Sequence, residues 1–384
     1  MSLAEHPARS AAEIPPHTAI VDCDVHVQMP GIHALFPYLS DYWKDAILNW
    51  MPHASNQAAD IRADWFAKPL RVNYPFDLPT SALEGTLPNT AASTEAALGI
   101  LREKLLDAWA TEIAILNDAY FVDQFHNPYM ADALASAAND WLVAEWLERE
   151  PRLRGSLLVQ ASQPDLAVAE IERLGDHPSI VQVLLPVRSA VPYGNRRHHP
   201  ILEAAVRHGL AVGLHFGGWP GTPTTSVGWT SYYIEDYAGR AHSFQAQLLS
   251  LVTEGVFDRM PDLRVVFVES GFAWLPPLMW RFDKDWKGMR RETPWLRRPP
   301  SSYVRDHFKF TLQPFDGPDD PGFMGRFADQ MGADDMVLFS TDHPHWQFDT
   351  PAEALPPGVD GETLTGILSE TARRFYRLEG GSGH

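Results

Sequence analysis

The chain has 384 residues, of which 31 are Lys or Arg and 49 are Asp or Glu, giving a formal net charge of −18 with 45% hydrophobic residues. This composition is that of a globular protein and excludes a disordered or fibrous one. The acidic balance argues against nucleic acid or an anionic membrane as a partner, because both bind patches of Lys and Arg. The lone Cys23 cannot form an internal disulfide, and neither a signal peptide nor a membrane-spanning run is evident, so we expect a cytoplasmic protein.

Short apolar or β-branched runs alternate with helical patterns along the chain. The predicted strands are Ala19–Val27, Glu112–Leu116, Gly155–Gln160, Ile180–Leu185, Leu210–Phe216, Leu263–Glu269, Phe308–Leu312 and Met336–Thr341. The predicted helices are Asn127–Glu150, Asp165–Leu174, Pro200–His208, His242–Val256, Phe323–Met331 and Glu362–Tyr376. This alternation indicates parallel strands joined by crossover helices. Eight strands favour a (β/α)8 TIM barrel over an open sheet, and we expect one domain over residues 1–384.

The connection after the first predicted strand is the main irregularity in this pattern. It covers about residues 28–100, far more than an ordinary strand-to-helix loop. It is rich in aromatic residues, among them Trp43, Trp50 and Trp65. We interpret it as a long insertion over the barrel mouth.

The first predicted strand contains the sequence Val21-Asp22-Cys23-Asp24-Val25-His26. Because side chains alternate along a strand, the three polar residues should share the face toward the barrel axis, and Val21, Cys23 and Val25 should face the helices. Buried carboxylates and imidazoles are costly unless they are paired or bound to a metal, and residues two apart can reach one cation. The alternative is an edge strand with polar residues on its wet face.

Three later strands also end in residues capable of chemistry. His215 follows an apolar run and precedes Gly217 and Gly218, Glu269 follows the run 265–268, and Asp342 follows the run 337–339. Taken singly, these residues could be a core histidine, a carboxylate at a helix N-terminus and an Asx-turn. In a barrel, however, the C-terminal ends of all strands meet at one mouth, where catalytic residues are expected.

Together these motifs resemble the amidohydrolase superfamily, in particular its amidohydrolase-2 branch, which includes the aminocarboxymuconate-semialdehyde decarboxylases. The resemblance extends from about Ile20 to Tyr376. The first-strand motif of that branch, Asp-x-His-x-His, here reads Asp22-Cys23-Asp24-Val25-His26. His215 matches the ligand histidine of strand 5, and Asp342 matches the metal-bound aspartate of the Ser-Asp-x-Pro-His element, with Thr341 in place of its serine.

The resemblance implies a metal held by Asp24, His26, His215 and Asp342, with Asp342, Glu269 and His215 as catalytic residues. Zn is the metal that this mixture of imidazoles and carboxylates favours, with Mn as the alternative. Two departures stand out. Glu269 occupies the place of a histidine that helps activate the metal-bound water, so it could act as a base or signal a different reaction. Arg281 is offset by one residue from an arginine that binds the substrate carboxylate.

The implied activity is metal-dependent nonoxidative decarboxylation of a planar aromatic or heterocyclic carboxylic acid. Arg281, Trp219, His345 and Trp346 are the expected substrate contacts. The alternative is a metal-dependent hydrolase that cleaves an amide, lactone or C–C bond through a metal-bound hydroxide. A non-catalytic binding protein fits less well, because all four ligand positions hold residues able to bind a metal. By analogy with dimeric relatives, we expect a homodimer or a higher homo-oligomer.

Overall fold

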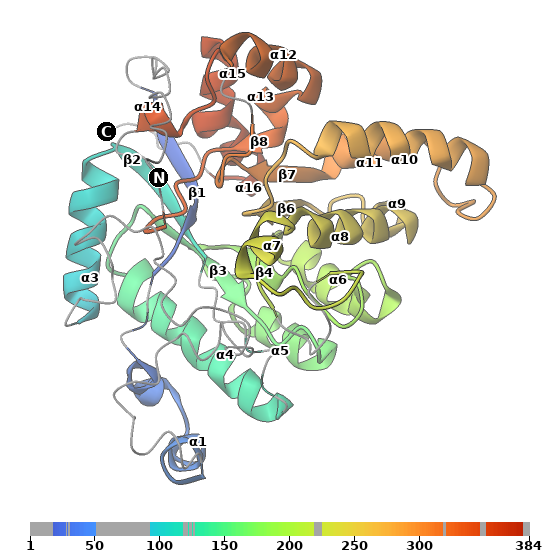
Figure 1. Ribbon diagram of the computed structural model, residues 1–384. Coiled ribbons are helices and arrows are strands. Elements are labelled where there is room, and N and C mark those ends of the chain that lie inside the picture. Colours follow the sequence, from blue (N-terminus) through green and yellow to red (C-terminus); the bar gives the residue numbers. More distant parts are fainter. Residues whose placement is uncertain are drawn as a thin grey trace.

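The computed structural model describes residues 18–27, 29, 31–50, 93–117, 122, 125, 127–218, 225–317, 320–345 and 351–378. Figure 1 shows strands at the centre of the molecule and helices around them. The strands are β1 (Ile20–Val25), β2 (Thr111–Leu116), β3 (Leu153–Leu158), β4 (Ile180–Pro186), β5 (Ala211–His215), β6 (Val265–Val268), β7 (Phe308–Thr311) and β8 (Val337–Leu338). They form one eight-stranded sheet in the order β1 to β8.

The sheet closes into a barrel between its first and last strands. All neighbours from β1 to β8 pair in parallel. The chain after β8 then bonds to β1, because Cys23 N donates to Phe339 O at 2.9 Å and His26 N donates to His343 O at 2.7 Å. The predicted (β/α)8 barrel is therefore confirmed.

Helices cover the outside of this barrel. Those between β1 and β4 are η1 (Ile32–Tyr38), α1 (Asp41–Asp45), η2 (Ala46–Trp50), α3 (Thr94–Leu101), η4 (Arg102–Asp107), α4 (Pro128–Leu142), η6 (Val143–Leu147) and α5 (Pro164–Leu174). Those between β4 and β7 are η7 (Arg196–His198), α6 (His199–Arg207), α7 (Tyr233–Ala238), α8 (Ala241–Thr253), α9 (Val256–Arg259), α10 (Leu275–Met289) and α11 (Pro300–His307). The rest are α12 (Pro321–Met331), α13 (Ala333–Met336), α14 (Pro351–Ala354), α15 (Gly361–Thr365), η8 (Gly366–Glu370) and α16 (Thr371–Tyr376).

Local sequence signals explain where several of these helices begin and end. The Asn127 side chain caps α4 by accepting hydrogen bonds from Tyr129 N and Met130 N, and Pro128 occupies the first turn, where no N–H is needed. The predicted helix His242–Val256 is instead two helices, α8 and α9, because Gly255 between them has a φ of 70°. The amphipathic helices α10 and α11 were not predicted. They lie side by side and project from the barrel in Figure 1.

The predicted orientation of side chains is wrong for the first half of β1. A shift in register between Asp22 and Val25 marks an irregularity in the pairing with β2. In this half of the strand, Val21 and Cys23 pack in a cluster that also contains Ala211 of β5 and residues of β2, β4, β6, β8 and α16. Val21 and Cys23 therefore lie in the barrel interior. Val25 belongs to the main core between strands and helices. The irregularity thus separates Asp22 from Asp24 and His26, although all three alternate regularly in the sequence.

The predicted insertion is described near its two ends, at residues 31–50 and 93–100. There η1 packs against α4, and Tyr38 donates a hydrogen bond to Glu145 at 3.3 Å. Residues 51–92 lie outside the described residues, so coverage of the barrel mouth stays a prediction. In the part of the chain that the structure describes, no helix is both long and apolar enough to cross a membrane.

Candidate metal centre

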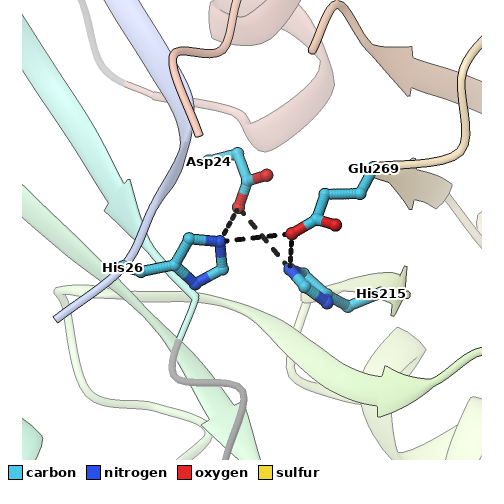
Figure 2. Close-up of side chains that lie close together, drawn as sticks. All are labelled: Asp24, His26, His215 and Glu269. Carbon is cyan, nitrogen blue, oxygen red and sulfur yellow. Dashed lines mark ion pairs between the residues drawn. The ribbon is translucent and has the colours of Figure 1, made fainter. Parts of the chain in front are cut away.

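Five side chains from four strand ends meet at the C-terminal mouth of the barrel. Asp24 and His26 come from the end of β1, His215 from the end of β5, Glu269 directly follows β6, and Asp342 follows β8. All five are at least 93% buried, since their exposed fractions range from 0% to 7%. Figure 2 shows Asp24, His26, His215 and Glu269 pointing toward one another. The structure therefore brings together the chemistry-bearing strand ends that the sequence singled out.

The donor atoms of this cluster lie at distances suited to a shared cation. His26 Nε2 is 3.0 Å from Asp342 Oδ1 and 3.5 Å from both Asp24 Oδ1 and Glu269 Oε1. His215 Nε2 is 3.2 Å from Glu269 Oε1 and 3.9 Å from Asp24 Oδ1. The ligand atoms of Asp24, His26, His215 and Glu269 all lie within 4.8 Å of one another.

Both histidines are held with Nε2 toward the cluster. His26 Nδ1 is 2.8 Å from the main-chain oxygen of Asn117, and His215 Nδ1 is 2.7 Å from that of Phe216. A carbonyl oxygen can only accept, so each Nδ1 must carry a proton. The lone pair of each neutral ring is then on Nε2, as in histidines that bind metals.

This arrangement requires positive charge at its centre. Among the described residues, the buried atoms Asp24 Oδ2 and His26 Nε2 make no hydrogen bond. Burial raises the pKa of Asp24 to about 6, although His26 and His215 lower it. Burial lowers the pKa of His26, but the charge of Asp24 and the close carboxylates of Asp342 and Glu269 raise it well above its ordinary value. A divalent cation would satisfy these donors, whose oxygen and nitrogen atoms suit Zn or Mn.

Asn117, which the sequence analysis did not single out, supports the β1 side of the centre. It follows β2 and is fully buried, and its Nδ2 donates to Asp24 Oδ1 at 2.8 Å and to Cys23 O at 3.1 Å. Its own Oδ1 accepts from Ser156 Oγ and from Gln182 Nε2, both at 2.6 Å. The signal was present in the sequence, because Asn117 is a polar residue at the end of an apolar strand.

Asp342 is held by the segment that follows β8. Its φ of 57° is in the left-handed region, which is rare outside glycine and common at functional sites. Its N–H donates to Asp24 O at 3.0 Å. The preceding Thr341 donates through N and Oγ1 to the two carboxylate oxygens of Asp22, at 3.0 and 2.6 Å. Asp22 thus anchors the Asp342 segment to β1 and is not itself a member of the cluster.

Arg240, also missed from the sequence, lies against Glu269. It precedes α8, is 8% exposed, and places Nη1 3.3 Å from Glu269 Oε2. Nothing in the local sequence distinguishes it from a surface arginine, because its burial depends on the packing of the segment after β5. On the same side of the mouth, Gly218 has a φ of 82°, and a Cβ there would lie 2.6 Å from Arg188 O.

The structure describes two of the four residues that we expect to contact the substrate. His345 is half-buried, and its Nδ1 lies 3.2 Å from Asp342 Oδ1. Arg281 lies on α10 with 68% of its side chain exposed and is ion-paired with Asp285 at 3.2 Å, so the described contacts do not bring it to the cluster. Trp219 and Trp346 lie outside the described residues.

Curated relatives with similar sequences are decarboxylases. The chain is 26% identical over 286 residues to the gamma-resorcylate decarboxylase of Polaromonas sp., covering 66% of this chain and 78% of the relative. It is 24% identical over 314 residues to the gamma-resorcylate decarboxylase of Rhizobium radiobacter, covering 73% of this chain and 87% of the relative.

Solved structures share the fold, and a family model matches almost the whole chain. The 2,6-dihydroxybenzoate decarboxylase from Rhizobium has a TM-score of 0.62 at 20% identity, covering 94% of this chain and 100% of the other. The 5-carboxyvanillate decarboxylase of Novosphingobium aromaticivorans, complexed with manganese and 4-hydroxy-3-methoxy-5-nitrobenzoic acid, has a TM-score of 0.67 at 16% identity, covering 94% and 97%. Residues 21–378 match the family model Amidohydro_2, described as amidohydrolase, and the chain therefore belongs to this amidohydrolase family.

Proposed function

We propose that the protein is a metal-dependent decarboxylase that removes CO₂ from a planar aromatic carboxylic acid without an oxidant. The observation that carries the proposal is the buried cluster of carboxylates with two histidines whose Nε2 atoms face it. Support comes from the relatives, which are decarboxylases of hydroxylated aromatic acids. The proposal covers one domain over the whole chain.

Asp24, His26, His215 and Asp342 would hold the metal. When bound, a divalent ion would neutralise the oxygens of an acidic substrate and fix its orientation in the mouth. The donor set suits Zn or Mn, and two structural neighbours were crystallised with manganese. We propose Zn as the ion, with Mn as the alternative. We also propose that the protein forms a homo-oligomer and that it is cytoplasmic.

We assign to Asp342 the delivery of the proton that the reaction consumes. A proton moves from its carboxyl group to the ring carbon that bears the substrate carboxylate, the bond to the carboxylate breaks, its electron pair returns to the ring, and CO₂ leaves. His345 Nδ1, 3.2 Å from Asp342 Oδ1, can return a proton to Asp342 after each turnover. Because His345 is half-buried, it can exchange that proton with solvent.

Glu269 is less suited to donate this proton. Burial raises its pKa, but His215, His26 and Arg240 lower it well below its ordinary value. The carboxyl group is then ionised at neutral pH and holds no proton to give. The sequence left both carboxylates as candidates, and we assign the proton transfer to Asp342, which His345 can reprotonate.

A substrate panel tests the proposal directly. The metal-loaded protein is incubated with 2,6-dihydroxybenzoate, 5-carboxyvanillate and other hydroxylated aromatic acids, and with amides and lactones of similar size, while CO₂ and hydrolysis products are measured. We expect CO₂ and the decarboxylated ring from at least one acid. Hydrolysis of an amide or lactone with no CO₂ from any acid would instead establish the hydrolase alternative.

A further inference from the structure

We propose that Glu269 is an additional ligand of the metal and that Arg240 is the residue that positions it. This inference rests on the proposed metal centre and concerns a carboxylate that the proposed set of four ligands leaves out. The observation behind it is that the two oxygens of one buried carboxylate face different groups. Oε1 faces the histidines, and Oε2 faces a buried guanidinium.

The Oε1 atom of Glu269 occupies a ligand position. It lies 3.2 Å from His215 Nε2 and 3.5 Å from His26 Nε2, the atoms that carry the lone pairs of both rings. Three electron-rich atoms that face one another are stable only if a cation lies between them or a ring takes up a proton. In the part of the chain that is described, Glu269 belongs to both groups of residues that could hold a metal ion.

The backbone of Glu269 is fixed in an unusual conformation. Its φ is 58°, which costs energy for a residue with a side chain. Its N–H donates to Thr311 Oγ1 at 3.0 Å, and Arg240 Nη1 lies 3.4 Å from its carbonyl oxygen. Arg240 therefore contacts both the main chain and the carboxylate of the same residue, which limits how the side chain can turn.

Arg240 is itself held in place. Its Nε donates to Tyr237 O at 3.0 Å, and its guanidinium lies 3.6 Å from the centre of the Tyr237 ring and 4.9 Å from that of Phe216. Stacking on aromatic rings and a hydrogen bond from Nε leave few rotamers open. A rigid arginine of this kind can orient a carboxylate in a way that a mobile surface lysine cannot.

Charge gives a second reason for the pairing. Asp24, Glu269 and Asp342 carry three negative charges when ionised, and Arg240 carries one positive charge, which leaves two for a divalent ion to balance. Without Arg240, a third buried carboxylate would be uncompensated. The guanidinium thus allows this chain to use a carboxylate at the end of β6 without excess negative charge around the metal.

Manganese affinity in a double-mutant cycle tests the inference. The free Mn²⁺ signal in electron paramagnetic resonance reports binding to the full chain and to Glu269→Gln, Arg240→Met and the double variant. If Arg240 positions Glu269 as a ligand, Glu269→Gln should weaken binding about 10- to 100-fold in the normal background and less than about threefold beside Arg240→Met.

Two other results would overturn the inference. Unchanged affinity in Glu269→Gln would show that Glu269 is not a ligand. An equal or larger loss beside Arg240→Met would show that Glu269 binds the ion without help from Arg240, because an unpaired carboxylate attracts a cation more strongly. In either case a protein that still binds Mn²⁺ and releases CO₂ leaves the proposed function standing, whereas failure of the unaltered chain to do either contradicts that function.

Arg188 supplies the matched control. It is also buried, lies 5.1 Å from the centre of the same Phe216 ring, and is ion-paired with Asp236. In the Arg188→Met background, Glu269→Gln should cost as much affinity as in the unaltered chain. Circular dichroism checks that each variant folds. If Arg240→Met does not fold, Arg240→Lys replaces it in the cycle. Beside Arg240→Lys, Glu269→Gln should then weaken Mn²⁺ binding more than threefold, but less than it does in the normal or the Arg188→Met background.

Discussion

The Nδ1 atom of His26 lies 2.8 Å from the main-chain oxygen of Asn117, whose side chain lies 2.8 Å from the carboxylate of Asp24. One residue at the end of β2 thus fixes the ring orientation of His26 and the carboxylate orientation of its neighbour two residues earlier. Groups that orient metal ligands in this way contribute strongly to metal affinity.

Asn117→Ala should therefore weaken metal binding about 10- to 100-fold, because Asp24 loses its hydrogen bond while the main-chain contact of His26 remains. Competition with a chromogenic chelator measures the affinity. Asn139→Ala is the control, since Asn139 is equally buried but bonds to Leu158 and Glu170 outside the cluster. Equal metal affinity of the two variants would remove Asn117 from the support of the centre.

Asp342→Asn should lower kcat about 10²- to 10⁴-fold, the range expected when a proton donor is removed. Single-turnover release of CO₂ measures this loss, with substrate and metal both saturating so that weakened binding does not contribute. Asp335→Asn is the matched control. Asp335 lies on α13 and is ion-paired with Lys309 of β7 at 3.3 Å, and its loss should leave kcat within about twofold. A similar kcat for Asp342→Asn and the unaltered chain would assign the proton transfer to another group.

Glu150 should make folding stability depend on acidity. Its hydrogen bonds from Arg152, and then from Arg102, lower its pKa to about 2, although burial opposes the shift. A carboxylate with a lowered pKa stabilises the fold fully above its unfolded value near 4.5, and this contribution disappears as the pH falls toward 2.

Glu150→Gln should consequently destabilise the protein by about 2–3 kcal/mol at pH 7 and by much less at pH 3. Urea unfolding of the two proteins at several pH values gives the difference. A difference that stays constant from pH 7 to pH 3 would show that the carboxylate charge contributes nothing to stability.

Gly218→Ala should destabilise the fold by about 1–3 kcal/mol, because a Cβ at φ 82° would lie 2.6 Å from Arg188 O and from Pro186 Cβ. Gly99→Ala is the opposite case. Gly99 lies within α3 with nothing within 4 Å of a Cβ, so alanine there should stabilise the protein by up to about 1 kcal/mol. Thermal unfolding compares the two variants, and a shift of the same sign in both would contradict this reading of the glycines.

Much of the barrel can be predicted from local sequence, because each strand is a short apolar run and consecutive strands in the chain are neighbours in the sheet. The segment Ile180–Leu185, for example, differs from β4 by one residue. The last predicted strand, Met336–Thr341, is reduced to Val337–Leu338, because Phe339 N donates to Ile367 O instead of to a neighbouring strand. That bond depends on a helix nearly thirty residues later.

The candidate site likewise combines residues that local sequence predicts with residues that it does not. His215, Glu269 and Asp342 could be found as polar residues at the ends of apolar strands. The inward position of Cys23 could not, because strict alternation fails where β1 shifts register against β2. Arg240 could not be found either, because its role depends on stacking between Tyr237 and Phe216.

The requirement for a bound divalent ion is tested most directly by titrating metal back into metal-free protein. CO₂ release from an accepted aromatic acid is measured as Zn²⁺ or Mn²⁺ is added. Release should be absent without metal, rise in proportion to bound ion, and reach its maximum at one ion per chain. CO₂ release from metal-free protein at the rate of the loaded protein would contradict the proposed role of the cluster.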